Sequence, residues 1–307
     1  MTSDRPVTVI YHANCPDGFC AAWVLRRLYP AAEFVPASYG EPPPDVAGRR
    51  VVIADFSYKR PVMRQILSAA HSVTVLDHHK TAEAELAGIV DEFVQRPDLI
   101  ANPPGSELPS VRFDMTRSGG RLAWEHVWDA AYSHRFSSVL IDQYMTAPND
   151  RGHPPWLVRY TEDRDLWRWA LPESRAVSAA LRSYPFDFAE WDRLAELDPM
   201  SLVPEGRAIL RTDRQVIDRH VRNARPTAVG GYTVPAVNAT VLFSEIAGEL
   251  AEGQPFGACY FDRADGRRQW SLRSRAGGVD VSEVARSLGG GGHPNAAGFE
   301  EVMPCPR

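Results

Sequence analysis

Three adjacent polar residues, Asp77, His78 and His79, directly follow the β-branched and apolar run at residues 73–76. A short run of this kind is typical of a strand buried on both faces of a parallel sheet. The three side chains would then stand where a buried strand ends, which is the edge at which open α/β sheets bind ligands. Carboxylate and imidazole groups are poor core residues but good ligands for a divalent metal ion. The triplet predicts one part of a metal site.

Two earlier predicted strands also end in residues that can bind metal. The strand at 7–11 runs into His12 and Asp17, and the strand at 51–54 ends in Asp55. By itself, Asp17 suits a helix cap as well as a ligand, but its pairing with His12 favours the ligand. The carboxyl ends of neighbouring parallel strands share one edge of a sheet. Three polar ends in one repeating strand–helix pattern therefore predict a common site.

A fourth acidic contribution could come from the segment at 160–169, which carries Asp163 and Asp165. The alternative is a solvated helix end where aspartate pairs with arginine, and nothing local decides between the two aspartates. Two hard divalent ions about 4 Å apart can clamp a phosphoryl group when carboxylates, imidazoles and one bridging carboxylate hold them. Oxygen and imidazole ligands without thiolate favour Mn²⁺ or Mg²⁺ over a structural zinc ion. The predicted set has that mixture: His12, Asp17, Asp55, His78 and one of Asp163 or Asp165.

A second chemical motif lies near the end of the chain, where four glycines at 289–292 precede His293. Consecutive glycines expose backbone N–H groups that can cradle phosphate oxygens. The run matches neither the dinucleotide fingerprint nor the P-loop, because no GxGxxG follows the first strand and no GK[ST] occurs. A flexible linker is the alternative. The position of the run after a helix in a folded domain favours an anion-binding loop, with Arg273 as a neighbouring cation.

The composition is that of an ordinary globular chain long enough for two domains. It has 307 residues, of which 44% are hydrophobic and 24% charged. A formal net charge of −5 argues against broad electrostatic coating of nucleic acid, though not against a local basic groove. No apolar run approaches the roughly 20 residues of a membrane span, and the N-terminal residues lack signal-peptide features. We therefore expect a cytoplasmic protein with no membrane partner.

The cysteines, one serine and two tryptophans are expected to have structural roles and not to take part in chemistry. The four cysteines are scattered without CxxC spacing, which argues against a disulfide framework or a structural zinc site. Cys15 is interpreted as a small buried filler. Ser118 is expected to cap the helix that includes residues 122–128 rather than to contact a substrate. Trp124 and Trp128, four residues apart on that helix, are expected in the core rather than as nucleobase platforms.

The segments between the motifs complete an α/β pattern. The proline-rich stretch at 90–114 is expected to be a surface excursion, and the charged segment at 186–221 a helical connection between domains. After residue 226 the strands resume in a smaller domain. Its predicted elements are strands at 229–237, 256–261 and 268–274 and helices at 244–251 and 281–288.

Taken in order, these motifs resemble the DHH/DHHA1 phosphoesterase superfamily, which includes RecJ-like exonucleases, nanoRNase-like phosphodiesterases, cyclic-dinucleotide phosphodiesterases and family II pyrophosphatases. The resemblance covers the polar strand ends, the segment at 163–165, and the Gly-Gly-Gly-His and Ala-Ala-Gly sequences at 290–293 and 296–298. It implies an α/β fold with an N-terminal parallel-sheet DHH domain and a smaller C-terminal α/β DHHA1 domain. The implied limits are 1–190 for the catalytic domain, 191–226 for a helical linker and 227–307 for the substrate-binding domain.

The resemblance also implies a role for each candidate residue. The metal ligands would be His12, Asp17, Asp55, His78 and Asp165, with Asp163 as the second choice for the last position. The catalytic residues would be Asp55, which bridges two ions, His79, which faces the phosphoryl group, and Asp77, which orients the histidine pair. The substrate phosphate would be held by Arg273, Gly290, Gly291, Gly292 and His293.

The resulting hypothesis is a metal-dependent phosphodiesterase that hydrolyses short oligonucleotides or nucleotides, exonucleolytically, by attack of a metal-activated water on phosphorus. The expected cofactor is Mn²⁺ or Mg²⁺, as two ions, and the partner is short single-stranded nucleic acid or a nucleotide; a homodimer is left open. The alternatives are a pyrophosphatase or polyphosphatase, a cyclic-dinucleotide phosphodiesterase, and an inactive nucleotide-binding module. Asn14 favours the last, because the family commonly has an aspartate there and a neutral amide is a weaker ligand.

Overall fold

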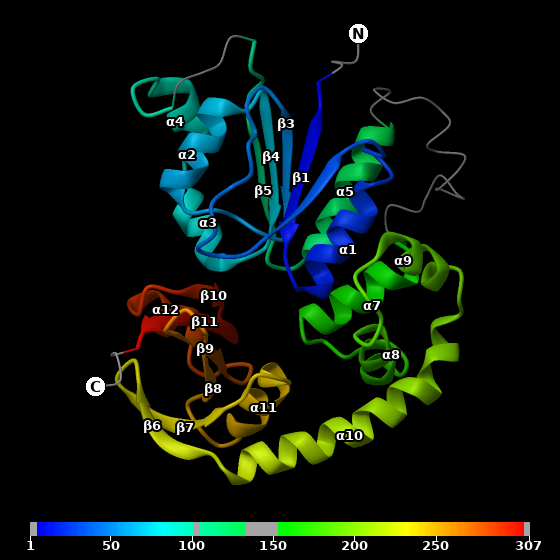
Figure 1. Ribbon diagram of the computed structural model, residues 1–307, viewed down its shortest axis with the longest axis vertical. Helices are drawn as coiled ribbons and strands as arrows, with labels where there is room; N and C mark the ends of the chain where they lie inside the picture. The colour runs from blue at the N-terminus through cyan, green and yellow to red at the C-terminus, as the bar shows by residue number, and fades with distance from the viewer. Residues whose placement is uncertain (1–4, 101–104, 133–152, 304–307) are drawn as a thin grey trace. The chain divides into compact units, whose positions relative to one another are not determined.

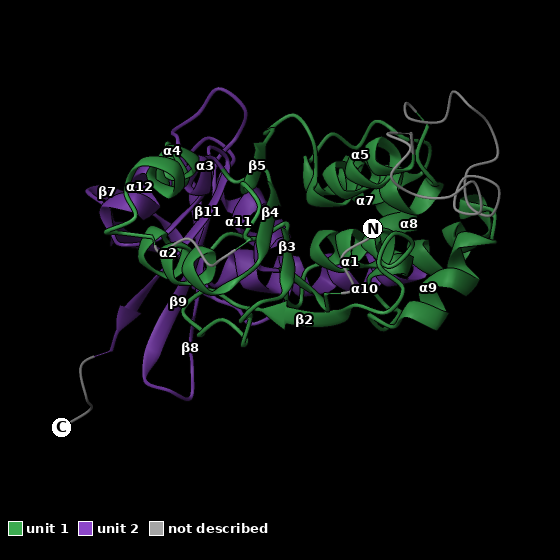
Figure 2. Ribbon diagram, turned by 90° about the horizontal axis from the view of Figure 1, so that it is seen from above, with its two compact units in different colours: residues 1–79, 85–207 green, residues 80–84, 208–307 purple. Residues whose placement is uncertain are grey.

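The computed structural model describes residues 5–100, 105–132 and 153–303. The chain forms two compact units, which Figure 2 shows in different colours. Unit 1 contains residues 1–79 and 85–207, and unit 2 contains residues 80–84 and 208–307. The functional domain limits at residues 190 and 227 stay a prediction.

Unit 1 is built on a five-stranded, wholly parallel sheet in the order β2-β1-β3-β4-β5 (Figure 1). The predicted α/β class with an N-terminal parallel sheet is therefore confirmed. The three central strands are the ones whose apolar runs and polar ends were recognised in the sequence. The strands are β1 (Val7–His12), β2 (Glu33–Ala37), β3 (Arg50–Ala54), β4 (Ser72–Asp77) and β5 (Ser110–Phe113).

Helices cover both faces of this sheet (Figure 1). On β1, Val9 packs into the core beneath α1 and α5, whereas Ile10 packs into the core beneath α2 on the opposite face. Trp124 and Trp128 of α5 lie in the first core, as predicted. The helices are α1 (Pro16–Leu25), α2 (Arg60–Ala69), α3 (Lys80–Leu86), α4 (Ile89–Gln95), α5 (Gly119–Tyr132), α7 (Trp156–Asp165), α8 (Ser174–Leu181) and α9 (Phe188–Ala195).

The structure corrects two expectations for unit 1. The stretch at 90–114 is not simply a surface excursion, because it contains most of α4 and the edge strand β5, which pairs with β4. Cys15 is half-buried instead of fully buried. Cys15, Cys20 and Cys259 are free thiols, and Cys305 lies outside the described residues.

Unit 2 contains a six-stranded mixed sheet in the order β10-β11-β9-β8-β7-β6. Only β7 and β8 among its neighbouring pairs are parallel. Helix α12 packs on the face that carries Trp270, and α11 packs with the end of α10 on the face that carries Val237. The elements are α10 (Val203–Arg222, continuing from unit 1), β6 (Arg225–Val229), β7 (Tyr232–Asn238), α11 (Phe243–Leu250), β8 (Gly257–Asp262), β9 (Arg267–Arg273), α12 (Val281–Ser287), β10 (Gly291–His293) and β11 (Ala296–Val302).

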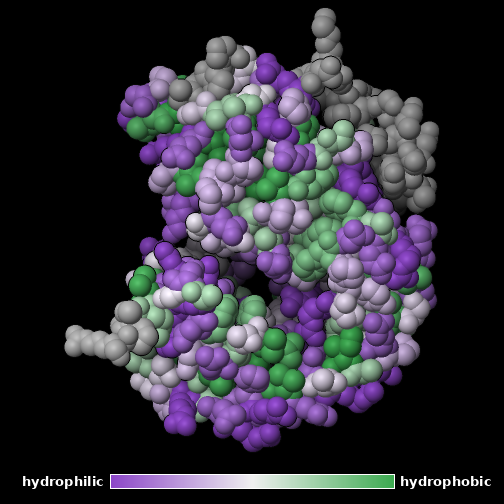
Figure 3. Space-filling view, viewed as in Figure 1, coloured by the Kyte–Doolittle hydropathy of each residue, from purple (hydrophilic) through white to green (hydrophobic). Residues whose placement is uncertain are grey.

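Hydrophilic and hydrophobic residues are mixed over the face of the molecule that Figure 3 presents. Within the described ranges, every helix is either too short or too polar to span a bilayer.

The short 3-10 helix η2 (Pro199–Leu202) leads into α10. The charged segment that we expected to be helical therefore consists of α9, η2 and α10.

Candidate metal centre

The predicted ligands at the strand ends lie at one edge of the unit 1 sheet. Strand β1 ends in His12, Asp55 directly follows β3, and β4 ends in Asp77. The register pairs Tyr11 with Ala54, and Ala54 with Leu76 on the next strand. Because the three strands run parallel and stop at the same level, their polar ends face the same space.

The metal-binding side chains form two groups around this edge. His12, Asp55 and His79 make the first group, and Asp17, His78 and Asp165 make the second. Within each group the three ligand atoms lie within 4.8 Å of one another.

In the first group, His12 Nδ1 is 3.5 Å from Asp55 Oδ2. In the second, His78 Nε2 is 3.7 Å from Asp17 Oδ2 and 3.6 Å from Asp165 Oδ2.

Asp55 connects the two groups. Its Oδ2 faces His12 of the first group, while its Oδ1 lies 2.9 Å from His78 Nε2 of the second. The residue has a φ of +55°, a left-handed conformation that is uncommon for residues other than glycine. Such backbone strain persists only where the surroundings impose it, and it is concentrated at functional sites. Asp55 therefore faces both groups with a single carboxylate.

Asp17 is held by the start of another helix. Its carboxylate accepts hydrogen bonds from the backbone N–H groups of Gly119 and Gly120, at 2.5 and 3.0 Å, at the start of α5. Asp17 therefore caps α5, which lies about 100 residues away in sequence, in addition to facing His78. Ser118 also caps α5, as expected, because its Oγ accepts the N–H of Arg121 at 3.2 Å.

The glycine pair at the start of α5 was not recognised as part of the site. A Cβ atom on Gly119 would lie 2.4 Å from the Cβ of Asp55, and one on Gly120 would lie 3.1 Å from Asp17 Oδ1. The backbone of α5 therefore packs directly against two candidate ligands. The adjacent glycines in the sequence were a signal of close approach, but only the folded chain shows what they approach.

The structure separates the two aspartates of α7. Asp165 contributes its carboxylate to the second group. Asp163 is buried elsewhere, where it accepts hydrogen bonds from Ala170 N at 2.9 Å, Leu171 N at 3.4 Å and the hydroxyl of Ser174. The candidate ligand Asp163 is thus not brought to the site, because its oxygens hold the loop after α7.

The two aspartates are expected to respond oppositely to amidation. Asp165→Asn should weaken Mn²⁺ binding at least about tenfold, with little change in the free energy of unfolding. Asp163→Asn should lower the free energy of unfolding by about 1–3 kcal/mol, because an amide NH₂ cannot accept the loop's hydrogen bonds. Calorimetric titration with Mn²⁺ and denaturant unfolding measure the two effects. The assignment is wrong if Asp163→Asn loses Mn²⁺ affinity while Asp165→Asn retains it.

Asp77 orients the histidine that follows it by two positions. Its Oδ1 lies 2.7 Å from His79 Nδ1 and also accepts the backbone N–H of His78 at 2.7 Å. Its Oδ2 accepts the hydroxyl hydrogen of Ser57 at 2.6 Å. Burial raises the pKa of Asp77, but the nearby His79 and Ser57 outweigh burial and lower it below the usual range. Asp77 is therefore a buried carboxylate bonded to Ser57, His78 and His79.

The electrostatics of the two groups suit a divalent cation. Burial, followed by the charges of Asp55 and Asp165, raises the pKa of Asp17 well above its usual range. Burial acts in the same direction on Asp55, but the nearby His12 and His78 outweigh it, and the pKa of Asp55 falls well below its usual range. Several buried carboxylates at this spacing repel one another unless a positive charge lies between them.

Two buried ligand atoms lack hydrogen bonds. Within the described part of the chain, His12 Nδ1 and Asp55 Oδ2 make none. The two atoms lie 3.5 Å apart, and buried polar atoms without hydrogen bonds are uncommon in native proteins. Donor chemistry, burial and these two atoms together fit metal binding.

Half of the glycine run of unit 2 is a hairpin strand: Gly289 and Gly290 lie before it, and Gly291 and Gly292 belong to it. Gly291–His293 forms β10 and pairs antiparallel with β11, with Gly292 opposite Ala297 and His293 opposite Ala296. Gly292 has a φ of +138°, and a Cβ atom on it would lie 2.5 Å from the carbonyl oxygen of Ala296. The predicted anion-binding loop is therefore wrong as secondary structure. The tight hairpin itself requires glycine there.

The predicted substrate residues of unit 2 share one end of its sheet. Arg273 ends β9 and pairs with Ala296, which in turn pairs with His293. The Arg273 guanidinium donates to Ser244 Oγ at 2.7 Å and to the carbonyl of Leu272 at 2.8 Å. Gly290 and Gly291 adjoin this ladder, so the structure brings the predicted residues of unit 2 into one neighbourhood.

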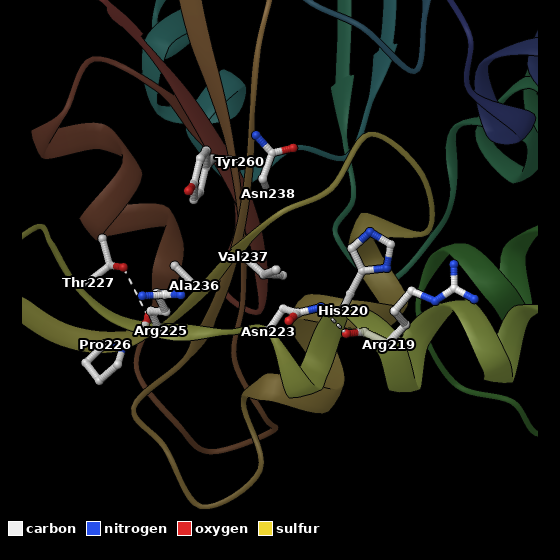
Figure 4. A pocket seen from close by; sticks show the side chains of 10 residues that line it. All are labelled: Arg219, His220, Asn223, Arg225, Pro226, Thr227, Ala236, Val237, Asn238 and Tyr260. Carbon is white, nitrogen blue, oxygen red and sulfur yellow. Dashed lines mark hydrogen bonds between the residues drawn. The ribbon is translucent and has the colours of Figure 1, made fainter.

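A separate hollow of about 500 Å³ lies in unit 2 (Figure 4). It reaches β8 at Tyr260, whereas Arg273 pairs with Gly257 at the other end of that strand. None of the predicted substrate residues lines it. Its lining consists of Arg219, His220 and Asn223 of α10, Arg225, Pro226 and Thr227 of β6, Ala236, Val237 and Asn238 of β7, and Tyr260.

The chain is similar in sequence to two known proteins. No family model matches the chain. It is 23% identical to uncharacterized protein R106 of Acanthamoeba polyphaga mimivirus, over 99% of this chain and 70% of that protein. It is 24% identical to oligoribonuclease NrnB of Bacillus subtilis (strain 168), over 77% of this chain and 54% of that protein. The similarity to an oligoribonuclease agrees with the resemblance of the sequence motifs to the DHH/DHHA1 phosphoesterase superfamily.

Three solved structures resemble this chain, each with a TM-score of 0.40. An uncharacterized protein from Helicobacter pylori G27 is 14% identical, covering 96% of this chain and 93% of that one. The pGpG-specific phosphodiesterase PggH from Vibrio cholerae is 14% identical, covering 97% and 94%. An exopolyphosphatase-related protein from Bacteroides fragilis is 12% identical, covering 98% and 88%.

Proposed function

We propose that this chain is a metal-dependent phosphodiesterase that hydrolyses short single-stranded oligonucleotides or nucleotides from one end. The observation that carries the proposal is the pair of ligand groups that Asp55 connects, as a member of the first group that lies 2.9 Å from His78 of the second. Adjacent carboxylate–imidazole groups with a common carboxylate suit two divalent ions, and such ion pairs suit displacement at phosphorus. The similarity to an oligoribonuclease supports nucleic acid as the substrate class.

In this proposal the ligands of Mn²⁺ or Mg²⁺ are five members of the two groups: His12, Asp17, Asp55, His78 and Asp165. Bound divalent ions neutralise phosphoryl oxygens and lower the pKa of water. Asp55 holds the two groups together, and the N–H groups of Gly119 and Gly120 fix the Asp17 carboxylate. Asn14 has a φ of +55°, a conformation that asparagine adopts more readily than most residues, so its presence has a backbone reason.

His79 is the residue proposed to meet the phosphoryl group. Its Nδ1 hydrogen bonds to Asp77, and that bond fixes both the ring orientation and the nitrogen that carries the proton. Because both nitrogens of an imidazolium ring are donors, the protonated ring can donate its Nε2–H to a phosphoryl oxygen as negative charge develops on it. Ser57 donates a hydrogen bond to the other oxygen of Asp77. Ser57 therefore fixes the carboxylate of Asp77, which in turn fixes the ring of His79.

The residues of unit 2 are proposed to bind a phosphate of the substrate. Arg273 supplies the cation, and the backbone and His293 of the glycine hairpin supply further donors. Under this proposal residues 1–190 form the catalytic domain, 191–226 the linker and 227–307 the substrate-binding domain. A site that grips one terminus favours exonucleolytic cleavage over internal cleavage.

A substrate panel tests the proposal. The purified chain with Mn²⁺ is offered a dinucleotide, a longer oligonucleotide, a cyclic dinucleotide, pAp and pyrophosphate. We expect release of mononucleotides from the dinucleotide and stepwise shortening of the oligonucleotide, both abolished by EDTA. Cleavage of pyrophosphate alone would identify a phosphoanhydride hydrolase instead. Nucleotide binding without any cleavage would identify an inactive binding module.

A further inference from the structure

An exposed tyrosine adjoins the metal centre of unit 1. Tyr39 lies in the turn after β2, the edge strand beside β1. The last pair of that ladder is His12 with Ala37, and Ala13 N donates to the Ala37 carbonyl at 2.9 Å. The chain therefore leaves β2 at the edge where the ligands gather, and Tyr39 follows two residues later.

The ring of Tyr39 packs against residues of the site. Its centroid is 4.7 Å from that of Phe56, which is fully buried and directly follows Asp55. It is 5.5 Å from the ring of His12 and 6.4 Å from the ring of His79, both in edge-to-face geometry. Tyr39 nevertheless keeps 49% of its surface exposed. A buried phenylalanine thus supports the ring while much of the residue stays open to solvent.

We propose that Tyr39 is a stacking platform for the nucleobase of the nucleotide whose phosphate lies at the metal centre. This inference rests on the proposed function and narrows its substrate class to molecules with a base. A supported aromatic ring loses little freedom on binding, and any base can stack on it, which suits a substrate recognised without strict sequence. Pyrophosphate and polyphosphate have no base that could stack on the ring. A contribution of Tyr39 to substrate binding would therefore favour a nucleotide substrate over a phosphoanhydride substrate.

The test compares two substrates that share one phosphodiester bond. The first is a dinucleotide, and the second is the same molecule with the bases replaced by hydrogen. With Mn²⁺, Tyr39→Ala should raise KM for the dinucleotide about 10- to 100-fold and leave kcat nearly unchanged. The same variant should hydrolyse the base-free substrate like wild type. Tyr39→Phe keeps the ring and should behave like wild type on both substrates.

Tyr232 provides the matched control. It is 38% exposed in unit 2, and its ring packs edge-to-face on the buried Phe256 at 5.4 Å. Tyr232→Ala should therefore leave both reactions unchanged. Equal losses of Tyr39→Ala on both substrates would overturn the inference and make the ring a support for the site. Wild-type kinetics of Tyr39→Ala on the dinucleotide would overturn it as well.

Failure of the proposed function is distinguishable from failure of this inference. Equilibrium dialysis of the dinucleotide against the wild type and Tyr39→Ala measures stacking without requiring hydrolysis. If the wild type cleaves no phosphodiester but binds the dinucleotide at least tenfold more tightly than Tyr39→Ala does, the platform is supported and the enzyme assignment is overturned. If the two proteins bind the dinucleotide equally, the platform is overturned whatever the activity.

Discussion

The Asp55→Asn variant is expected to hydrolyse a dinucleotide in Mn²⁺ on the order of 10³- to 10⁴-fold more slowly than wild type. Asp55 faces His12 of the first ligand group with one oxygen and His78 of the second with the other. An amide has one oxygen and no charge, and it therefore cannot bridge two cations. Because asparagine also tolerates the left-handed φ of +55° at this position, the backbone should keep its conformation.

Two measurements separate loss of the centre from loss of the fold. The kcat/KM for the dinucleotide reports the reaction, and the rise in Tm on adding Mn²⁺ reports ion binding. Asp55→Asn should lose most of both while remaining folded by circular dichroism. Asp91→Asn, an exposed position on α4, is the matched amidation and should change neither. Wild-type kcat/KM in Asp55→Asn would remove Asp55 from the bridging role and the proposed mechanism with it.

The sequence predicts the centre of the unit 1 sheet better than its edges. Strands β1, β3 and β4 are buried on both faces, and their sequences are runs of mostly β-branched and apolar residues that identify them as strands. The edge strands escaped prediction for physical reasons. β2 contains Pro36, which only an edge strand tolerates, and β5 has four half-exposed or exposed residues. Tyr39 was missed with β2, because its place beside the site depends on that edge strand.

Within the site, sequence reasoning finds ligands that follow strands and misses partners that depend on tertiary contacts. Asp163 and Asp165 are two positions apart on α7, so their side chains leave the helix in different directions. Only packing decides that Asp165 faces His78 while Asp163 holds the loop ahead of Ser174. The capping of α5 by Asp17 likewise joins residues about 100 positions apart.

The Gly119→Ala variant is expected to lose at least about 10²-fold in kcat/KM, although residue 119 offers no ligand. The added Cβ atom would lie 2.4 Å from the Cβ and 2.9 Å from the Cα of Asp55, so Asp55 or the start of α5 must move. Either movement displaces a ligand, because the N–H of residue 119 also holds the Asp17 carboxylate. A displacement of about 1 Å in a catalytic group costs roughly 10²-fold in rate. Overpacking should also lower the free energy of unfolding by about 1–3 kcal/mol.

Gly248→Ala is the matched control for this variant. Gly248 lies in α11, and a Cβ atom there would meet no atom within 4 Å. The control should retain full activity and gain about 0.5–1 kcal/mol in the free energy of unfolding, because alanine is the better helix former. Thermal unfolding with and without Mn²⁺ then distinguishes the two glycines. Gly119→Ala should lose most of the Mn²⁺-induced rise in Tm, and Gly248→Ala should keep all of it. An undiminished Mn²⁺ response in Gly119→Ala would show that the ligands tolerate a displaced α5, and that the glycine pair serves helix packing alone.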